Sequence, residues 1–263
     1  MKILPENEFM ALLQGLNFWT LKQRIKDATA QRASTIQLLY RVDLYADLST
    51  TDRLYLQTIR DAKKQQAWIR SHGKLTKTTG FMKSHSFTLQ FQQIMIDALW
   101  SRVEQTVSVN PTNTTASVRD TTNTLRQLVA ATAQAYNNIP CANAPVATVA
   151  YGILAGTGAT APASTDYNIQ TLIAQGSGSG QLQYQATTVG SSGIVGANVD
   201  TIIARVIVNG SAGTITITEI GLVIQMTDSG NNWRNFLVIH DSVSQAVNAG
   251  TVAIVSYDIR TTV

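Results

Sequence analysis

Apolar side chains in the first hundred residues recur at intervals typical of one face of a helix. The stripe is clearest in Glu6–Leu16, and it continues through Phe18–Arg32. The polar cluster Ser49–Asp52 is a good helix start and opens a third run that reaches Arg70. Ser86–Val103 repeats the pattern once more. The spacing therefore predicts a mainly helical region over residues 1–104.

Residues 105–146 carry a mixed signal. Ser117–Arg119 and Thr124–Arg126 flank a turn-like tetrapeptide and can form a hairpin. Alternatively, the alanines and glutamines of Leu125–Tyr136 favour a helix. Asn137–Pro145 contains two prolines and is a candidate domain boundary.

From residue 147 onward, apolar positions alternate or form short runs between turns, as in β-strands. In Thr201–Val208 the even-numbered positions are apolar, and Ile203 and Ile207 add apolar side chains to the other face. Such a strand is buried on both sides, either by a second sheet or by a neighbouring subunit. The Gly-rich segment Asn209–Gly213 predicts a hairpin loop after it. Further strands are expected in Val149–Leu154, Gln181–Thr188, Asn235–His240 and Val252–Arg260.

The strand Thr214–Ile224 changes phase along its length. Ile215 and Ile217 share a face, but the apolar positions then resume at Ile220. A β-bulge near Glu219 to Gly221 accounts for the slip, because an extra residue moves later side chains to the opposite face. The alternative is a strand without a bulge that is buried on both faces.

These elements predict an α+β fold in three parts. Residues 1–104 form a mainly helical, basic docking region, and residues 105–146 form a linker with a possible hairpin. Residues 147–263 form an antiparallel β-sandwich of jelly-roll-like or immunoglobulin-like type.

Charged residues make up only 14% of the chain, and small polar residues replace them. A surface of this kind costs little to desolvate against a neighbour, which suits a protein whose surface is largely contact area. The first 104 residues hold 15 of the 20 basic residues. We expect Lys74, Lys77 and Lys83, in and after a polar loop at Lys74–Thr79, to form a basic docking loop for another protein rather than for nucleic acid.

The candidate chemistry is sparse. His72, His85 and His240 have no Cys, Asp or Glu at metal-ligand spacing, and His240 is predicted to be a surface residue at a strand end. Glu219 stands alone in an apolar strand and needs a partner, either backbone N–H groups near the bulge or a cation such as Arg205.

Other features point away from cofactors and secretion. Cys141 is the single cysteine, so no disulfide forms within the chain. Gly156–Ala161 matches a dinucleotide-binding pattern, but a proline and a turn follow it instead of a helix. Gly176–Gly180 lacks the Lys-Ser/Thr of a phosphate loop. The segment Met1–Phe9 has no apolar run of signal-peptide length, and no stretch is apolar enough to cross a membrane, so we expect folding in the cytoplasm with no cofactor.

Several short motifs resemble tailed-bacteriophage virion proteins, in particular tail-collar and tail-fibre attachment domains. A Gly156-Thr-Gly158 turn precedes Asp166-Tyr-Asn-Ile169, and the strand Thr216-Ile-Thr-Glu-Ile-Gly-Leu222 follows. A Gly250…Tyr257-Asp-Ile259 strand closes the pattern. Gly73–Lys77 with Ser86–Phe91 is similar to the N-terminal part of related phage structural proteins.

The resemblance implies a non-enzymatic virion protein on the tail side, at the collar, tip or fibre attachment. A head-decoration protein is the alternative. We expect a homo-oligomer, a trimer or a higher ring, with Glu219, Gly221, Arg205, Ile203 and Ile207 as candidate structural or contact residues. A glycan-binding adhesin would instead use exposed aromatic side chains, for which the candidates are Tyr167, Tyr184, Trp233 and Phe236. A cell-wall hydrolase would need a carboxylate pair, which the sequence does not indicate.

Overall fold

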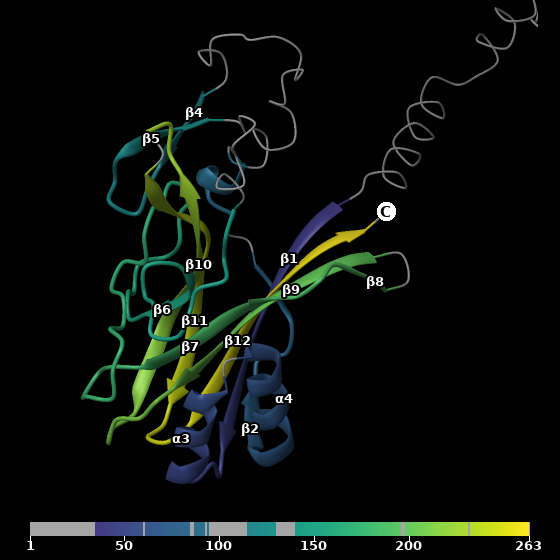
Figure 1. Cartoon of the computed structure of the whole chain (residues 1–263), viewed down its shortest axis with the longest axis vertical. Coiled ribbons are helices and arrows are strands. Elements are labelled where there is room, and N and C mark those ends of the chain that lie inside the picture. The colour runs from purple at the N-terminus through teal and green to yellow at the C-terminus, as the bar shows by residue number, and fades with distance from the viewer. Residues whose placement is uncertain are drawn as a thin grey trace, which may run out of the picture.

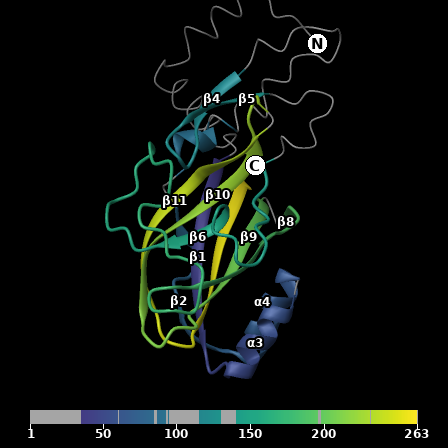
Figure 2. The ribbon, with the colours of Figure 1, turned by 60° about the vertical axis from the view of Figure 1, so that its left-hand side comes forward.

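The computed structural model describes residues 35–59, 61–84, 87–92, 94, 115–129, 140–195, 198–230 and 232–262. Two antiparallel sheets face each other, and a two-stranded hairpin lies at one end of them (Figures 1 and 2). The larger sheet has the strand order β2-β1-β12-β9-β7, with β3 paired to β1 and β8 paired to β9, and the smaller sheet has the order β11-β10-β6. The larger sheet comprises β1 (Thr35–Ala46), β2 (Lys74–Thr78), β3 (Met82–Lys83), β7 (Gln183–Val189), β8 (Gly193–Val195), β9 (Asn198–Val208) and β12 (Val252–Thr262). The smaller sheet comprises β6 (Gly152–Gly156), β10 (Ile215–Thr227) and β11 (Trp233–Val247), and the hairpin comprises β4 (Thr115–Arg119) and β5 (Leu125–Val129).

The described residues are mostly strands in antiparallel sheets, so the predicted α+β fold with a mainly helical N-terminal region is wrong. Thr35–Ala46 is the long strand β1, which pairs with β12 from Thr35↔Thr262 to Tyr45↔Val252. The expected basic loop at Lys74–Thr79 is mostly strand β2, which pairs with the other edge of β1. Alternating apolar residues of β1, from Leu38 to Leu44, enter the core between the sheets, and this burial decides the strand conformation. The helices expected at 6–16 and 18–32, and most of the helix expected at 86–103, lie outside the described residues.

Strands from both sides of residue 146 share the larger sheet, so the expected separation of residues 1–104 from 147–263 does not hold there. The hairpin expected within the 105–146 linker is present as β4 and β5, and it also contacts the smaller sheet. The Thr121 N–H donates to Asn235 O, and the Ser229 N–H donates to Gln127 O. No described helix is long and apolar enough to cross a bilayer.

Two helices cover the outer face of the larger sheet: α3 (Thr50–Thr58) and α4 (Ala62–His72). The helix start predicted near Ser49 is confirmed, since Ser49 and Asp52 form a reciprocal capping box. The single helix expected up to Arg70 is instead two, because the chain leaves the helix after Thr58 and Asp61 caps α4. Leu56 and Ile69 pack on Val206, Val208 and Ile254 of the sheet.

Strand β9 is therefore buried on both faces over its second half. Ile203 and Ile207 face the smaller sheet in the main core, while Val206 and Val208 face the helices. The second cover is a pair of helices of the same chain. Ile203 and Ile207 are 6% and 0% exposed, so they offer no surface to another subunit.

The predicted phase slip in β10 is confirmed. The pairing register with β11 shifts between Ile217 and Glu219, and again between Leu222 and Val223. The unpaired extra residues lie on β11, so each shift is a bulge of that strand. Ile217 and Ile220 both reach the main core, whereas Val223 contacts the opposite, outer cluster.

The segment Asn209–Gly213 is not a hairpin loop. It crosses from β9 in the larger sheet to β10 in the smaller one. The buried Asn209 holds this crossing, because its amide donates to Gly213 O at 2.8 Å and to Val247 O at 2.7 Å. The Asn209 N–H also donates to Thr251 O, and the Gly250 N–H donates to Asn209 O. These two bonds join the 209–213 crossing to the neighbouring crossing at 248–251.

Candidate functional site

Glu219 lies at the centre of a buried hydrogen-bond cluster on the outer face of the smaller sheet. Its Oε1 accepts the N–H groups of Gly158 and Thr171, each at 2.8 Å, and its Oε2 accepts the Gln170 N–H at 3.0 Å. His240 Nε2 lies 2.9 Å from the same Oε2. Backbone N–H groups were expected to bind Glu219, and they do. They belong to the loop between β6 and β7, however, and not to the residues near the bulge.

These partners fix the charge state of Glu219. Burial alone raises the carboxyl pKa, but the hydrogen bonds from Thr171, Gln170, His240 and Gly158 outweigh it, so the pKa is lowered. Glu219 is therefore ionised at neutral pH, and both of its oxygens are occupied. This is the chemistry of an anchor, not of a general acid.

His240 is fully buried, so its predicted place at the surface is wrong. Its Nδ1 lies 2.7 Å from Asp166 Oδ2, opposite the contact with Glu219. Both contacts are hydrogen bonds only when both ring nitrogens carry protons or when one carboxyl group is protonated. The ring thus links the 157–182 loop to β10 and β11 at two points. No local sequence signal indicated that His240 lies between these two carboxylates, since Asp166 is 74 positions away.

Gly221 is required where this loop meets the sheet. A Cβ at this position would come within 2.7 Å of Ile169 Cδ1 and 2.8 Å of Ile239 O. The glycine lets the loop approach β10 closely enough for the bonds to Glu219 to form.

Arg205 does not pair with Glu219. It is fully buried, and its guanidinium donates to backbone carbonyls, including Gln185 O at 2.7 Å, Thr148 O at 2.6 Å and Ile153 O at 2.9 Å. Its Cζ also lies 4.9 Å from the centre of the Tyr184 ring. Burial lowers the pKa of Arg205 to about 10, which leaves it charged at neutral pH. Arg205 ties β9 to β6 and to the segments around them.

The four candidate glycan-binding aromatics do not form a platform. Tyr184 and Phe236 are buried in the core, Trp233 is 53% exposed at the start of β11, and Tyr167 is half-buried. On the helices, the partly buried Trp68 ring stacks on the exposed His72 at 4.3 Å and lies 5.5 Å from the exposed Tyr55. His85 lies outside the described residues.

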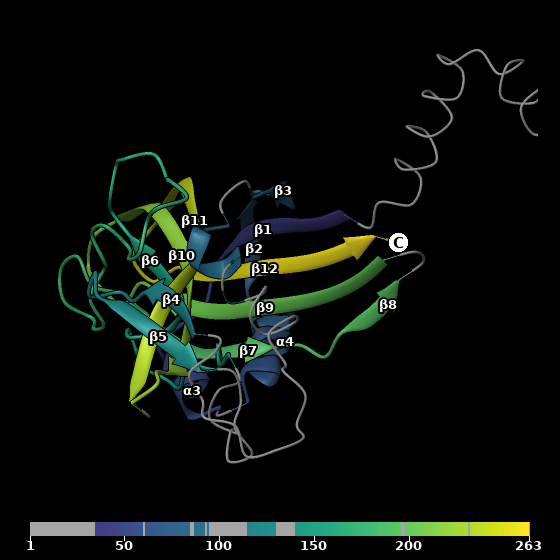
Figure 3. The ribbon, with the colours of Figure 1, turned by 90° about the horizontal axis from the view of Figure 1, so that it is seen from above.

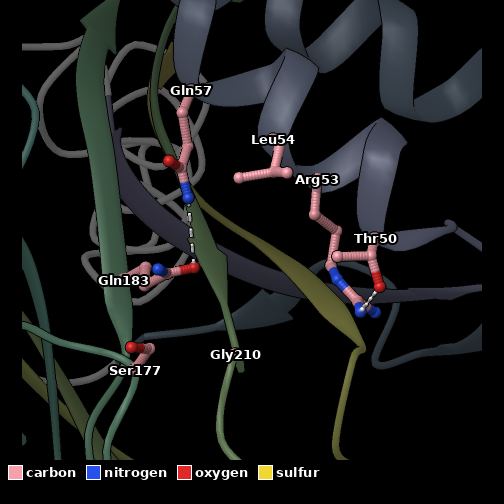
Figure 4. Close-up of a pocket in the computed structure, with 7 residues that line it drawn as sticks. All are labelled: Thr50, Arg53, Leu54, Gln57, Ser177, Gln183 and Gly210. Carbon is pink, nitrogen blue, oxygen red and sulfur yellow. Dashed lines mark hydrogen bonds between the residues drawn. The ribbon is translucent and has the colours of Figure 1, made fainter.

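A pocket of about 140 Å³ lies between α3 and the loops at one end of the larger sheet (Figure 4). Its one charged side chain, Arg53, is already engaged, since Nη1 donates to Gly250 O at 2.8 Å and to Leu48 O at 3.2 Å. Gln57 and Gln183 face each other across it at 3.5 Å. The lining offers hydrogen bonds but no acid–base pair. It consists of Thr50, Arg53, Leu54, Gln57, Ser177, Gln183 and Gly210.

The larger sheet extends well past the smaller one and forms a projecting arm, which we define as residues 190–195, 198–202 and 258–262 (Figures 1 and 3). Burial along β9 shows where the smaller sheet and the helices stop covering the larger sheet. Residues 203–208 are buried, and residues 198–202 are not. Ile194 is 82% exposed and pairs directly with Val199, which is 36% exposed. Ile202, on the opposite face, is 45% exposed. Apolar side chains are thus uncovered on both faces of the arm.

The charges on the arm are paired within the chain. Arg260 bonds Asp200 through Nε and Nη2, each at 2.8 Å, and reaches Asp258 at 3.1 Å. Arg260 lowers the pKa of Asp200, while burial and the nearby Asp200 raise the pKa of Asp258. Desolvating the arm against a partner would therefore leave few unpaired charges.

Lys74, Lys77 and Lys83 are spread along the β2–β3 edge of the larger sheet, opposite Ala46, Leu44 and Leu39 of β1, and all three are exposed. Cys141 is half-buried and bonds Gln225 through both backbone groups. Among the described residues, no group of three or more His, Cys, Asp or Glu could hold a metal ion.

Comparison of the chain with protein-family models, with curated proteins and with solved structures gave no match.

Proposed function

We propose that this chain is a non-enzymatic structural protein of a tailed-phage particle, and that it works by assembling with copies of itself through the arm. The placement on the tail side rests on the resemblance of Thr216–Leu222 and the motifs around it to tail-collar and tail-fibre attachment domains. The assembly rests on the structure of the arm.

The observation that carries the proposal is the exposed apolar surface at Ile194, Val199 and Ile202, on a sheet extension that the smaller sheet does not cover. Burying such side chains contributes about 25 cal/mol for each Å² removed from water. The short edge strand β8 also leaves backbone groups available for pairing.

A second copy suits this surface because the arm is nearly neutral. Asp200 is already paired with Arg260, so two arms, or an arm and the body of another copy, approach without repulsion. A projection on one side of a body can meet a different surface of the next copy. Repeated contacts of this kind give a ring where the rotation between copies closes and an open filament where it does not. A trimer or a higher ring is the expected product.

The buried polar residues support a mechanical role. Glu219, Arg205, Asn209 and His240 all fasten loops to strands, and none faces the pocket. Their bonds hold the sandwich rigid behind the arm, as a load-carrying subunit requires.

The test is the mass of the purified protein by light scattering over a concentration series. We expect a closed oligomer for the natural sequence and a shift to monomer for the double variant Ile194→Lys/Ile202→Lys. The matched control is Leu125→Lys/Leu172→Lys, which changes two exposed leucines outside the arm and should leave the mass unchanged. A natural sequence that stays monomeric at every concentration, or two double variants with equal effects, would contradict the proposal.

A further inference from the structure

The free edge formed by β2 and β3 is a second interaction surface of different character from the arm. β2 lies at the end of the strand order of the larger sheet, and β3 pairs with the same strand, β1. All residues of β2 and β3 are exposed. Within the described sheet, no strand pairs with their outer side, so their backbone groups can accept one more strand.

The edge itself carries three lysines, and the preceding helix α4 carries three more basic residues. The segment 62–84 contains six Lys and Arg residues and no Asp or Glu. Each of the six is exposed, and none forms an ion pair within the described chain. They are Lys63, Lys64 and Arg70 on α4 and Lys74, Lys77 and Lys83 on β2 and β3.

Apolar side chains are interspersed with these charges. Leu75 is 45% exposed, and Phe81 and Met82 are each 47% exposed. Arg41 lies over the Phe81 ring at 5.5 Å, but it is paired with Asp43 at 2.8 Å, so the free positive charge of the edge comes from its lysines. A strand with alternating apolar and acidic side chains would satisfy both the apolar and the basic groups of this edge.

Charge decides which strand can bind. Two copies of this edge would bring like-charged lysines face to face, which opposes pairing, as lysines on exposed edges commonly do. An acidic strand gains from the same lysines. We propose that the β2–β3 edge binds an acidic, extended segment of another protein by adding it as a further strand of the larger sheet. This inference does not depend on assembly through the arm.

The edge favours a protein strand over nucleic acid because β2 and β3 present backbone N–H and C=O groups on their outer side. These groups lie in two short runs, with a register shift near Thr76 in the first. The phosphates of a nucleic acid would contact the lysines but would leave the backbone N–H and C=O groups of the edge unpaired. Duplex DNA is therefore included in the test as the competing ligand.

The experiment uses the full chain and a capped peptide in which valine and glutamate alternate over about eight residues, the length of an ordinary strand. Isothermal titration at low salt should show binding, and hydrogen exchange should slow at the amides of 74–78. A peptide with the same glutamates but with proline at alternate valines keeps the charge and cannot form the ladder, so it should bind at least about tenfold more weakly.

Two charge-reversal variants locate the site. Lys74→Glu/Lys77→Glu/Lys83→Glu should weaken binding of the valine–glutamate peptide by about tenfold or more. Lys63→Glu/Lys64→Glu/Arg70→Glu changes the net charge equally but lies on α4, and should weaken it much less. Thermal unfolding checks that both variants fold.

Three outcomes would overturn the proposal. The first is no binding of the valine–glutamate peptide at low salt. The second is equal binding of the proline peptide, or equal effects of the two triple variants, since either means attraction by charge alone. The third is binding of duplex DNA through the same lysines when the peptide does not bind.

Discussion

Three backbone N–H groups and one imidazole converge on the Glu219 carboxylate, and five backbone carbonyls surround the Arg205 guanidinium. Both side chains are almost fully buried. Where an irregular segment lies against a sheet, each of these side chains supplies hydrogen bonds that strand pairing would otherwise supply. The stability of the molecule at these places depends on single side chains.

Glu219→Gln should lower the free energy of unfolding by about 2–4 kcal/mol, because the new amide points N–H groups at existing donors and the charge is lost. Chemical denaturation measures the change. Asp61→Asn is the control: Asp61 also accepts backbone N–H groups, from Lys63 and Lys64, but it is exposed, so its effect should be smaller. If both variants lost the same free energy of unfolding, the buried Glu219 cluster would stabilise the fold no more than an exposed carboxylate does.

The same carboxylate predicts an acid-sensitive fold. The pKa of Glu219 is lowered in the folded state, so its contribution to stability is complete above the ordinary glutamate pKa of 4.5 and is lost as the pH falls through the folded-state value. Denaturation curves should show the natural sequence losing stability below about pH 4.5, and Glu219→Gln losing less over the same range. Parallel pH profiles would rule out this cause.

Arg205→Met should destabilise the fold by about 3 kcal/mol or more, because the carbonyls of Gln185, Ile153 and Thr148 lose their donors in a dry environment. Arg205→Lys keeps the charge and part of the hydrogen bonding, so its loss should be smaller. Thermal and chemical unfolding of the pair measure the difference. A methionine variant as stable as the natural protein would show that packing alone holds these segments.

At the scale of elements, the contact between the 157–182 loop and β10 requires the absence of a side chain at one position. Gly221→Ala should cost about 1–3 kcal/mol, since its Cβ meets backbone at Ile239 as well as the flexible end of Ile169. Gly213→Ala is the matched control, because nothing lies within 4 Å of its Cβ position. Unfolding midpoints should move for the first variant only, and a shift in both would point to chain entropy instead.

Some elements could be predicted from their own residues alone, without knowledge of the strands with which they pair. The alternation in Thr201–Val208 and Val252–Arg260 indicated β9 and β12. The change of phase at Glu219 indicated a register shift there, but not that the extra residue lies on the partner strand β11. The helix start at Ser49 was predictable for the same reason, but the reciprocal capping box with Asp52 was not predicted.

Non-local pairing explains what the sequence did not reveal. Thr35–Ala46 is apolar on both faces and lies among helical signals, so only its pairing with β12 identifies it as a strand. The contacts of His240 depend on a loop folding back over the sheet, and those of Arg205 depend on carbonyls that carry no residue-specific signal. Glu219 was noticeable because a lone carboxylate in an apolar strand needs partners, but the partners themselves were not predictable.

At the scale of the whole molecule, the two surfaces should respond differently to salt. Assembly through the apolar arm should keep the same mass by light scattering from about 0.05 to 0.5 M salt, because its charges are already paired. Binding of the acidic peptide to the β2–β3 edge should weaken over that range. An oligomer that dissociates in salt would mean that charge, rather than the arm, holds the copies together.

The pairing of β1 with β12 joins segments that are more than two hundred positions apart in the chain. During synthesis, β1 leaves the ribosome early and has no central partner until residues 252–262 emerge. The larger sheet therefore closes late, and long-range pairing of this kind is slow. The sequence thus delays formation of the finished sheet, and with it the arm, until translation has passed β12.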